Sequence, residues 1–283
     1  METVLIPTDF SDSSFNAAKY AAELSREIKI GRIVLLKSYH ISVYEQLLCT
    51  ADFVQLSQDE IDEEIEDQRN KLKMLASELQ RIADTDTVIE IRVSELQLIR
   101  SIYETVHQER ADLILIGSDD KVKTGQESYI GSNVINIAKS SPIPVLIIPP
   151  AYRFEAVKKA VIACDLKKTS QYLSEERLLR IFKNIPADFL VLNVDPTGKH
   201  LHPDEKLQHE LNLLNQKLKD FRYQTYFSEN KDIIKGILDF TTEQQAQLII
   251  ALPKEHSFFN SLTHKSITAG LSMASQKPVL ILK

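Results

Sequence analysis

The sequence predicts an α/β protein of two tandem, doubly wound domains, each built around a parallel five-stranded sheet. Short continuous apolar runs alternate with amphipathic helical segments, which is typical of parallel strands covered on both faces. The same series of segments also occurs twice, in the same order. We therefore expect one domain over residues 1–150 and a second over residues 151–283, because two prolines at 149–150 end a strand there.

Four pairs of similar segments carry this internal repeat. They are residues 4–9 and 160–165, 32–36 and 188–192, 111–116 and 246–251, and 144–148 and 278–282. Because all four pairs keep their order, duplication of one domain explains the whole chain.

The elements of the first half follow from the same patterns. Apolar runs predict strands near residues 3–7, 32–37, 88–93, 112–117 and 144–148. The capping boxes Ser57-Gln58-Asp59-Glu60 and Ser94-Glu95-Leu96-Gln97 predict the starts of two helices. The first of these helices carries an apolar side made of Ile61, Ile65, Leu72, Leu75, Leu79 and Ile82. The acidic cluster at 59–67 is interpreted as a solvated helix start rather than a metal site.

Ligands of doubly wound sheets bind beyond the carboxyl ends of the strands, so the residues just after the strands are the candidates. They include residues 8–11, residues 37–40 and the segment that begins at Gly117. Three of the seven glycines lie in the loop from Gly117 to Gly131, where Gly131-Ser132 opens a helix. The first amides of a helix bind anions, and glycine lets the backbone approach a phosphate closely. Turn and cap chemistry without any ligand is the alternative.

These segments resemble tandem universal stress proteins of the UspA family, of the Bacteroidetes type. The resemblance rests on residues 4–11, 111–117, 131–132 and 141–147, and in the second half on residues 256–259 and 264–266. It implies Rossmann-like (UspA/HUP-type) domains and a regulatory protein of the stress response that is not an enzyme. It also implies that the last strands of the two halves, 144–148 and 278–282, meet in an intramolecular pseudo-dimer. A homodimer of whole chains stays open.

Nucleotide-binding members of this family share a Gly-x2-Gly-x9-Gly-Ser/Thr loop. Carried over by position, the resemblance implies that Asp9, Gly117, Gly131 and Ser132 bind an adenine nucleotide, ATP, in the first half. The loop departs from the motif because Asp120 replaces the second glycine, and ten residues instead of nine separate position 120 from Gly131.

The charges in this loop work against a triphosphate. Asp119 and Asp120 disfavour a bound anion unless a metal ion or the nearby Lys121 and Lys123 offset them. Two alternatives to an ATP-binding regulator therefore stay open. One is a scaffold that binds no nucleotide. The other is a weak Mg²⁺-dependent ATPase that uses carboxylates such as Asp9.

The second half has a degenerate loop. No glycine occurs between Pro253 and Ala269, and Lys265-Ser266 stand near the expected helix start. We therefore expect no ATP site there. Asp165 matches Asp9, and its neighbour Cys164 is expected to be buried. The roles of His256 and His264 stay open.

Composition and missing motifs exclude several classes. The net charge, 34 − 40 = −6, argues against a nucleic-acid binder, and no apolar run approaches the roughly 18 residues of a membrane span. Two cysteines and a first segment without basic residues favour the cytoplasm. Neither a Gly-x-Ser-x-Gly elbow nor a Gly-x4-Gly-Lys-Ser/Thr loop occurs, so no catalytic residue is expected. His200, His202 and His209 are interpreted as a loop running into a helix, with no metal site expected.

Overall fold

The computed structural model describes residues 2–40, 58–118, 129–166, 173–183, 185–196, 198, 204–252 and 267–283. The chain divides into two compact units, Met1–Ile116 and Gly117–Lys283. This division comes before residue 150, because the strand β5 (Val145–Ile148) pairs with the last strand of the chain. The boundary of the duplicated domains at 150 stays a prediction from the repeat. None of the helices in the described ranges is long and apolar enough to cross a membrane.

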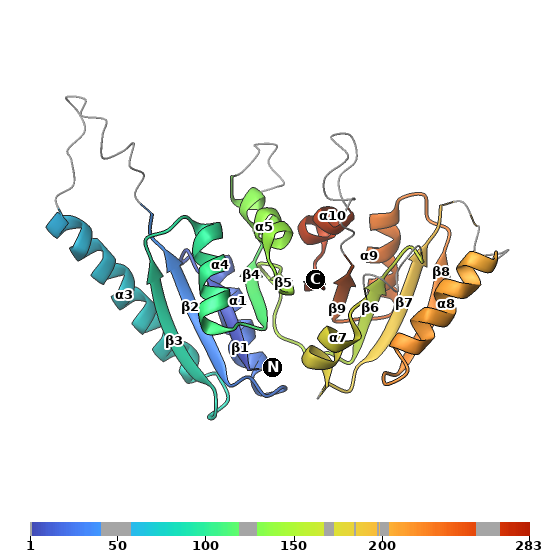
Figure 1. The fold of residues 1–283 in the computed structure, drawn as a ribbon, viewed down its shortest axis with the longest axis horizontal. Coiled ribbons are helices and arrows are strands. Elements are labelled where there is room, and N and C mark those ends of the chain that lie inside the picture. The colour runs from blue at the N-terminus through green and yellow to red at the C-terminus, as the bar shows by residue number, and fades with distance from the viewer. Residues whose placement is uncertain are drawn as a thin grey trace, which may run out of the picture. The chain divides into compact units, whose positions relative to one another are not determined.

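The first unit contains a parallel sheet with the strand order β3-β2-β1-β4. Its strands are β1 (Thr3–Pro7), β2 (Arg32–Ser38), β3 (Val88–Ser94) and β4 (Leu113–Gly117), the last of which ends at the border of the unit. The helices α1 (Asp12–Leu24), α3 (Gln58–Gln80) and α4 (Leu98–Glu109) connect them (Figure 1). The chain runs outward from β1 to β3 and returns to β4 on the other side of β1. The direction of winding therefore switches between β1 and β4.

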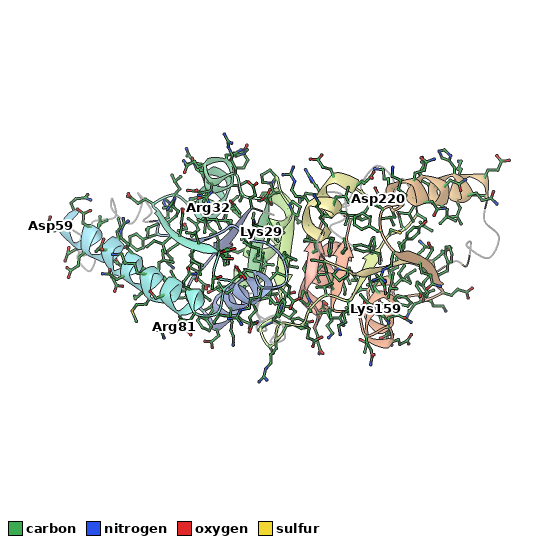
Figure 2. All side chains as sticks on the ribbon, turned by 90° about the horizontal axis from the view of Figure 1, so that it is seen from below. Lys29, Arg32, Asp59, Arg81, Lys159 and Asp220 are labelled. Atoms are coloured by element: carbon green, nitrogen blue, oxygen red, sulfur yellow. The ribbon has the colours of Figure 1, made fainter. Side chains whose placement is uncertain are left out.

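The core of this unit lies on both faces of the central strands. All five residues of β1 are buried, and the buried alanines of α1 let that helix pack closely on the sheet. On α3, the predicted apolar side is buried at Leu72, Leu75 and Leu79. Its outer residues Ile61 and Ile65 stay partly exposed. In Figure 2, Asp59 and Arg81 mark the two ends of this long helix.

One predicted capping box is wrong. The helix α4 begins at Leu98, and its N-cap is Gln97, which makes no side-chain cap hydrogen bond. Ser94 instead ends β3, where it pairs with Ser38 of β2. Its hydroxyl accepts from the N–H of Leu96 at 3.3 Å and from the hydroxyl of Ser101 at 2.9 Å. Pairing with β2 extends the strand through Ser94. The Ser94 side chain therefore stabilises the turn after the strand and does not cap the helix. The other box begins at Ser57, outside the described residues.

The second unit contains the predicted five-stranded parallel sheet of the second half, in the order β10-β9-β6-β7-β8. Its strands are β6 (Lys159–Ala163), β7 (Asp188–Val194), β8 (Tyr223–Ser228), β9 (Leu248–Ala251) and β10 (Val279–Ile281). Its helices are α5 (Tyr129–Ser140), α7 (Glu175–Phe182), α8 (Glu205–Lys217), α9 (Ile233–Glu243) and α10 (Ile267–Ala274). Asp204 caps α8 through a 2.8 Å hydrogen bond from the N–H of Leu207, so a helix begins where the sequence predicted it, whereas residues 199–203 lie outside the described residues.

The last strands of the two halves pair with each other. β10 runs antiparallel to β5, with Val279 opposite Ile147, Leu280 opposite Leu146 and Ile281 opposite Val145. On its other edge, β10 runs parallel to β9. The predicted meeting of 144–148 and 278–282 is therefore confirmed.

The duplication extends to single hydrogen bonds. The carboxylate of Asp112 accepts from the N–H groups of Glu2 and Thr3, at 2.7 and 3.1 Å. At the matching place, the side-chain oxygen of Gln247 accepts from the N–H groups of residues 158–159, both at 3.0 Å. In each half, the side chain of the residue just before the fourth strand thus accepts hydrogen bonds from the backbone at the start of the first strand. The two side chains occupy the same position of the repeat.

The backbone repeats its unusual conformations as well. Phe10 and Leu166, each directly after the aspartate that follows a first strand, have φ angles of 65° and 53°. Arg110 and Gln245, each at the end of a helix, have φ angles of 52° and 53°. Residues other than glycine rarely adopt this left-handed region, so its recurrence at matching positions marks features that both copies keep.

Candidate functional site

The turn after β1 is held by its own small polar side chains. The N–H of Thr8 continues the sheet by donating to the carbonyl of Leu36 at 2.9 Å. The Thr8 hydroxyl accepts from the N–H of Phe10 at 3.1 Å and pairs with the hydroxyl of Ser14 at 3.0 Å. This bonding holds Phe10 in its left-handed conformation. Strained backbone at the carboxyl end of a central strand is where functional sites concentrate.

Asp9 stands on this turn with an exposed carboxylate. Its Oδ1 accepts from the hydroxyl of Ser11 at 2.5 Å and from the N–H of Ser11 at 3.0 Å. Ser11 in turn caps α1 by accepting from the N–H of Ser14. Partial burial raises the pKa of Asp9, but the hydrogen bonds from Ser11 outweigh it, so the pKa lies below its ordinary value. Asp9 is therefore a fixed, ionised acceptor at neutral pH.

Lys37 lies near the carboxyl end of β2, the neighbour of β1, and is partly buried. Its Nζ lies 5.1 Å from the centroid of the Phe10 ring, in a cation–π contact. Burial lowers the pKa of Lys37, the charge of Asp9 raises it and that of Lys71 lowers it, with a net decrease. Lys37 is one of the residues 37–40 that were predicted to follow a strand, but no role was predicted for it. The sequence feature that could have indicated a role for Lys37 is a lysine at the end of an otherwise apolar strand.

The end of β2 is anchored to the segments beside it. The hydroxyl of Ser38 donates to the carbonyl of Leu96 at 2.6 Å, and the N–H of Tyr39 donates to the carbonyl of Ser94 at 2.8 Å. The hydroxyl of Tyr39 also donates to the carboxylate of Glu64 on α3. Burial and the neighbouring Glu64 raise the pKa of Tyr39 to about 12. These bonds fix the backbone that carries Lys37.

The glycine loop is described only at its two ends. Gly117 is the last residue of β4, and the next N–H, that of Ser118, donates to the carbonyl of Ile148 at 2.9 Å. The helix α5 begins at Tyr129, two residues before the predicted start at Gly131-Ser132, so both residues lie within its first turn. Residues 119–128, which include Asp119, Asp120, Lys121 and Lys123, lie outside the described residues. Asp9 belongs to the first unit, whereas both ends of the loop belong to the second.

The second half has a different group at the place of Lys37. By the strand register of the two copies, the equivalent residue is Asn193, which is only 6% exposed. Its side-chain amide donates to the carbonyl of Cys164 at 3.1 Å. Cys164 itself is partly exposed, so its expected burial is wrong; it follows Ala163, the last residue of β6, and so lies just beyond the carboxyl end of that strand. His256, His264, Lys265 and Ser266 lie outside the described residues.

Metal-ligating side chains are dispersed in the part of the chain that the structure describes. Among those residues, no three His, Cys, Asp or Glu side chains are placed to hold one metal ion. His209 lies in the second turn of α8, whereas His200 and His202 lie outside the described ranges.

Comparison with known proteins assigns the chain to a family. The model of the universal stress protein family matches residues 1–149, which is more than half of the chain. The chain belongs to the universal stress protein family. A universal stress protein of Methanocaldococcus jannaschii is 27% identical over 146 residues, which are 51% of this chain and 80% of that protein.

Solved structures extend the likeness of fold to both halves. A universal stress protein of Archaeoglobus fulgidus is 17% identical and superposes with a TM-score of 0.71, covering 99% of this chain and 98% of that one. A putative universal stress protein of Pseudomonas aeruginosa is 13% identical with a TM-score of 0.61, covering 99% of this chain and 92% of that one. At these identities the likeness establishes the α/β fold alone.

Proposed function

We propose that this universal stress protein is a regulatory binding module of the stress response, without catalytic turnover. Its first half binds an adenine nucleotide, ATP, through Asp9, Gly117, Gly131 and Ser132. The bound nucleotide biases the conformation or the partner preference of the protein. The second half binds no nucleotide and serves as the structural partner of the first in an intramolecular pseudo-dimer.

The observation that carries the proposal is the polar cluster at the carboxyl ends of β1 and β2. Ligands of doubly wound sheets bind at this edge, next to the point where the winding switches. The first half places an ionised Asp9 and a partly buried Lys37 there, on a backbone that is held in a strained conformation. The family model covers this half, and the glycine loop begins at Gly117, the last residue of its fourth strand.

The structural role of the second half is supported by two features. The position equivalent to Lys37 holds a buried amide whose hydrogen bond is made inside the protein, to the carbonyl of Cys164. The final strand β10 pairs on both edges, with β5 and with β9. In the second half, the polar side chain at the ligand-binding edge is therefore already hydrogen-bonded within the protein. Its last strand, β10, pairs with β5, the last strand of the first half.

Thermal unfolding with and without ATP·Mg²⁺ tests the proposal. A ligand at 100 times its dissociation constant stabilises the native state by about 2.7 kcal/mol, which raises Tm by a few degrees in a chain of this size. We expect this increase for the wild type and its loss in Gly131→Val, because a branched side chain in the first turn of α5 obstructs close approach of a phosphate.

A matched control separates loss of the site from loss of stability. Lys265→Met changes the corresponding region of the second half and is expected to keep the full increase in Tm. Each variant is compared with itself with and without nucleotide, so a lower starting Tm does not affect the comparison. An unchanged Tm of the wild type, or an equal increase in Gly131→Val, would contradict nucleotide binding by the first half. Steady release of phosphate by the purified protein would contradict the absence of turnover.

A further inference from the structure

The outer edge of the second-half sheet is formed by β8, the last strand in the strand order (Figure 1). N–H groups of β7 and of the residue after it donate to the carbonyl groups of Arg222 and Ser228, at 2.9 and 2.8 Å. The even-numbered residues of β8 therefore direct their backbone groups toward β7. Because this direction alternates along a strand, the N–H and C=O groups of the odd-numbered residues point away from β7, along the open edge. These residues are Tyr223, Thr225 and Phe227.

The first half protects its corresponding edge with charged side chains. By the strand registers of the two copies, Gln224 and Tyr226 of β8 stand where β3 has Glu90 and Arg92. Those two charged side chains form an ion pair at 2.9 Å. Charged residues and prolines on an edge strand prevent it from pairing with another chain. The strand β8 contains neither, and its Phe227 is 39% exposed, so it lacks this protection.

The strand β8 is held in place by contacts on both of its faces. On one face, the hydroxyl of Tyr223 donates to the side-chain oxygen of Asn215 on α8. On the other face, the ring of Tyr226 lies 5.0 Å from the ring of Phe240 on α9. Neither contact uses the backbone groups of the open edge. The edge is therefore ordered before a partner binds, which lowers the entropic cost of adding a strand.

The charges at the two ends of β8 indicate which partner fits this edge. Arg222 directly precedes the strand and is 72% exposed, although it also pairs with Asp188, and the exposed Glu229 directly follows the strand. When two copies of β8 run antiparallel, Arg222 of one copy lies next to Glu229 of the other at both ends. Parallel copies would instead place like charges together. The edge is therefore complementary to an antiparallel copy of itself.

One register uses all the open backbone groups. A twofold axis at Thr225 places this residue opposite Thr225 of the second copy, and Tyr223 opposite Phe227. Each odd-numbered residue then donates one hydrogen bond to the other copy and accepts one from it. The aromatic side chains of Tyr223 and Phe227 also become cross-strand neighbours, which is a favourable pair on a sheet.

We propose that this protein forms a homodimer in which the β8 strands of two copies pair edge to edge, antiparallel, about a twofold axis at Thr225. Such a contact occupies the open edge of β8 in both copies, so assembly through it closes at two chains. Two short strands bury less area than a standard interface, so we expect a weak dimer with a dissociation constant in the micromolar range or above. The inference does not depend on nucleotide binding.

Sedimentation velocity of the whole protein, from micromolar to near-millimolar concentration, tests this assembly. We expect the wild type to change from monomer to dimer as the concentration rises. Thr225→Pro removes an N–H that points away from β7, so the fold is kept, but both central bonds between the copies are lost. It should weaken the dimer by at least about 10-fold. Ile91→Pro is the matched control, because Ile91 has the same place in the edge strand β3, and it should leave the dimer unchanged.

Cysteine cross-linking tests the register without a proline. In a background with Cys49→Ser and Cys164→Ser, mild oxidation of Thr225→Cys should give a disulfide-linked dimer. Residues directly opposite each other have Cα atoms about 5.5 Å apart, which a disulfide spans. Gln224→Cys is the control. The two copies of residue 224 are diagonal neighbours about 7–8 Å apart, so no disulfide should form.

Three results would overturn the proposal. The first is a wild type that stays monomeric at the highest concentration. The second is a dimer that persists at full strength in a folded Thr225→Pro protein, because the copies then meet elsewhere. The third is cross-linking of Gln224→Cys as fast as that of Thr225→Cys, because the register is then different. A dimer that Thr225→Pro weakens and that only Thr225→Cys cross-links would support it.

Discussion

Replacing Phe189 with alanine is expected to lower the free energy of unfolding of the second unit by about 3–5 kcal/mol. Phe189 lies on β7 and is 1% exposed. Its ring meets Phe182 and Phe221 edge-on, with both centroid distances at 5.1 Å. Truncation removes the buried area and both aromatic contacts, and it leaves a cavity between α7 and the sheet.

Hydrogen exchange measured by mass spectrometry locates this effect. In Phe189→Ala, the peptides of β7 and its neighbours should exchange faster, while those of β1 and β2 should not change, because the first unit has a core of its own. Phe227→Ala is the matched control. Phe227 is 39% exposed on the edge strand β8, so its loss should lower the free energy of unfolding by no more than about 1 kcal/mol. Equal losses in the two variants would show that the Phe189 cluster is not the core of the unit.

Leu280→Pro is expected to cost about 3 kcal/mol or more, and to separate β5 from the second-half sheet. Leu280 is the central residue of β10, is 1% exposed, and lies between Leu146 of β5 and Ile250 of β9. Proline has no N–H to donate to a neighbouring strand, and in a strand paired on both edges it also distorts the ladder. Leu280→Val, which keeps a strand-forming apolar residue, is expected to cost less than about 1.5 kcal/mol.

The pairing of β5 is measured by the exchange of its amide protons. In Leu280→Pro the amides of residues 145–148 should lose protection, whereas in Leu280→Val they should keep it. Protected β5 amides in the proline variant would mean that β10 does not hold β5 in the sheet. That result would remove the structural role that we propose for the second half.

The sequence predicted the strands well, because their apolar runs reflect burial on both faces. The residues 3–7, 32–37 and 88–93 match β1, β2 and β3 to within a residue. The capping box at Ser94 misled because local spacing does not reveal a long-range partner. Pairing with Ser38 of β2 extends the strand through Ser94, and the Ser94 hydroxyl accepts from the N–H of Leu96 instead of capping the helix.

The candidate site was only partly accessible from the sequence. Asp9 follows an apolar strand directly, so its position at the ligand edge could be predicted. The role of Lys37 could not, because it depends on the left-handed backbone of Phe10 and on the alignment of β2 beside β1. The contrast with the second half also required the structure. A sequence alone does not show that the amide of Asn193 is satisfied by the carbonyl of Cys164.

Equilibrium dialysis of the whole protein against ATP·Mg²⁺ tests the central claim most directly, because it counts binding sites without relying on stability or activity. We predict one ATP bound per chain for the wild type, none for Gly131→Val, and one for Lys265→Met. No bound ATP in the wild type, two per chain, or one per chain that persists in Gly131→Val would contradict a single nucleotide site in the first half.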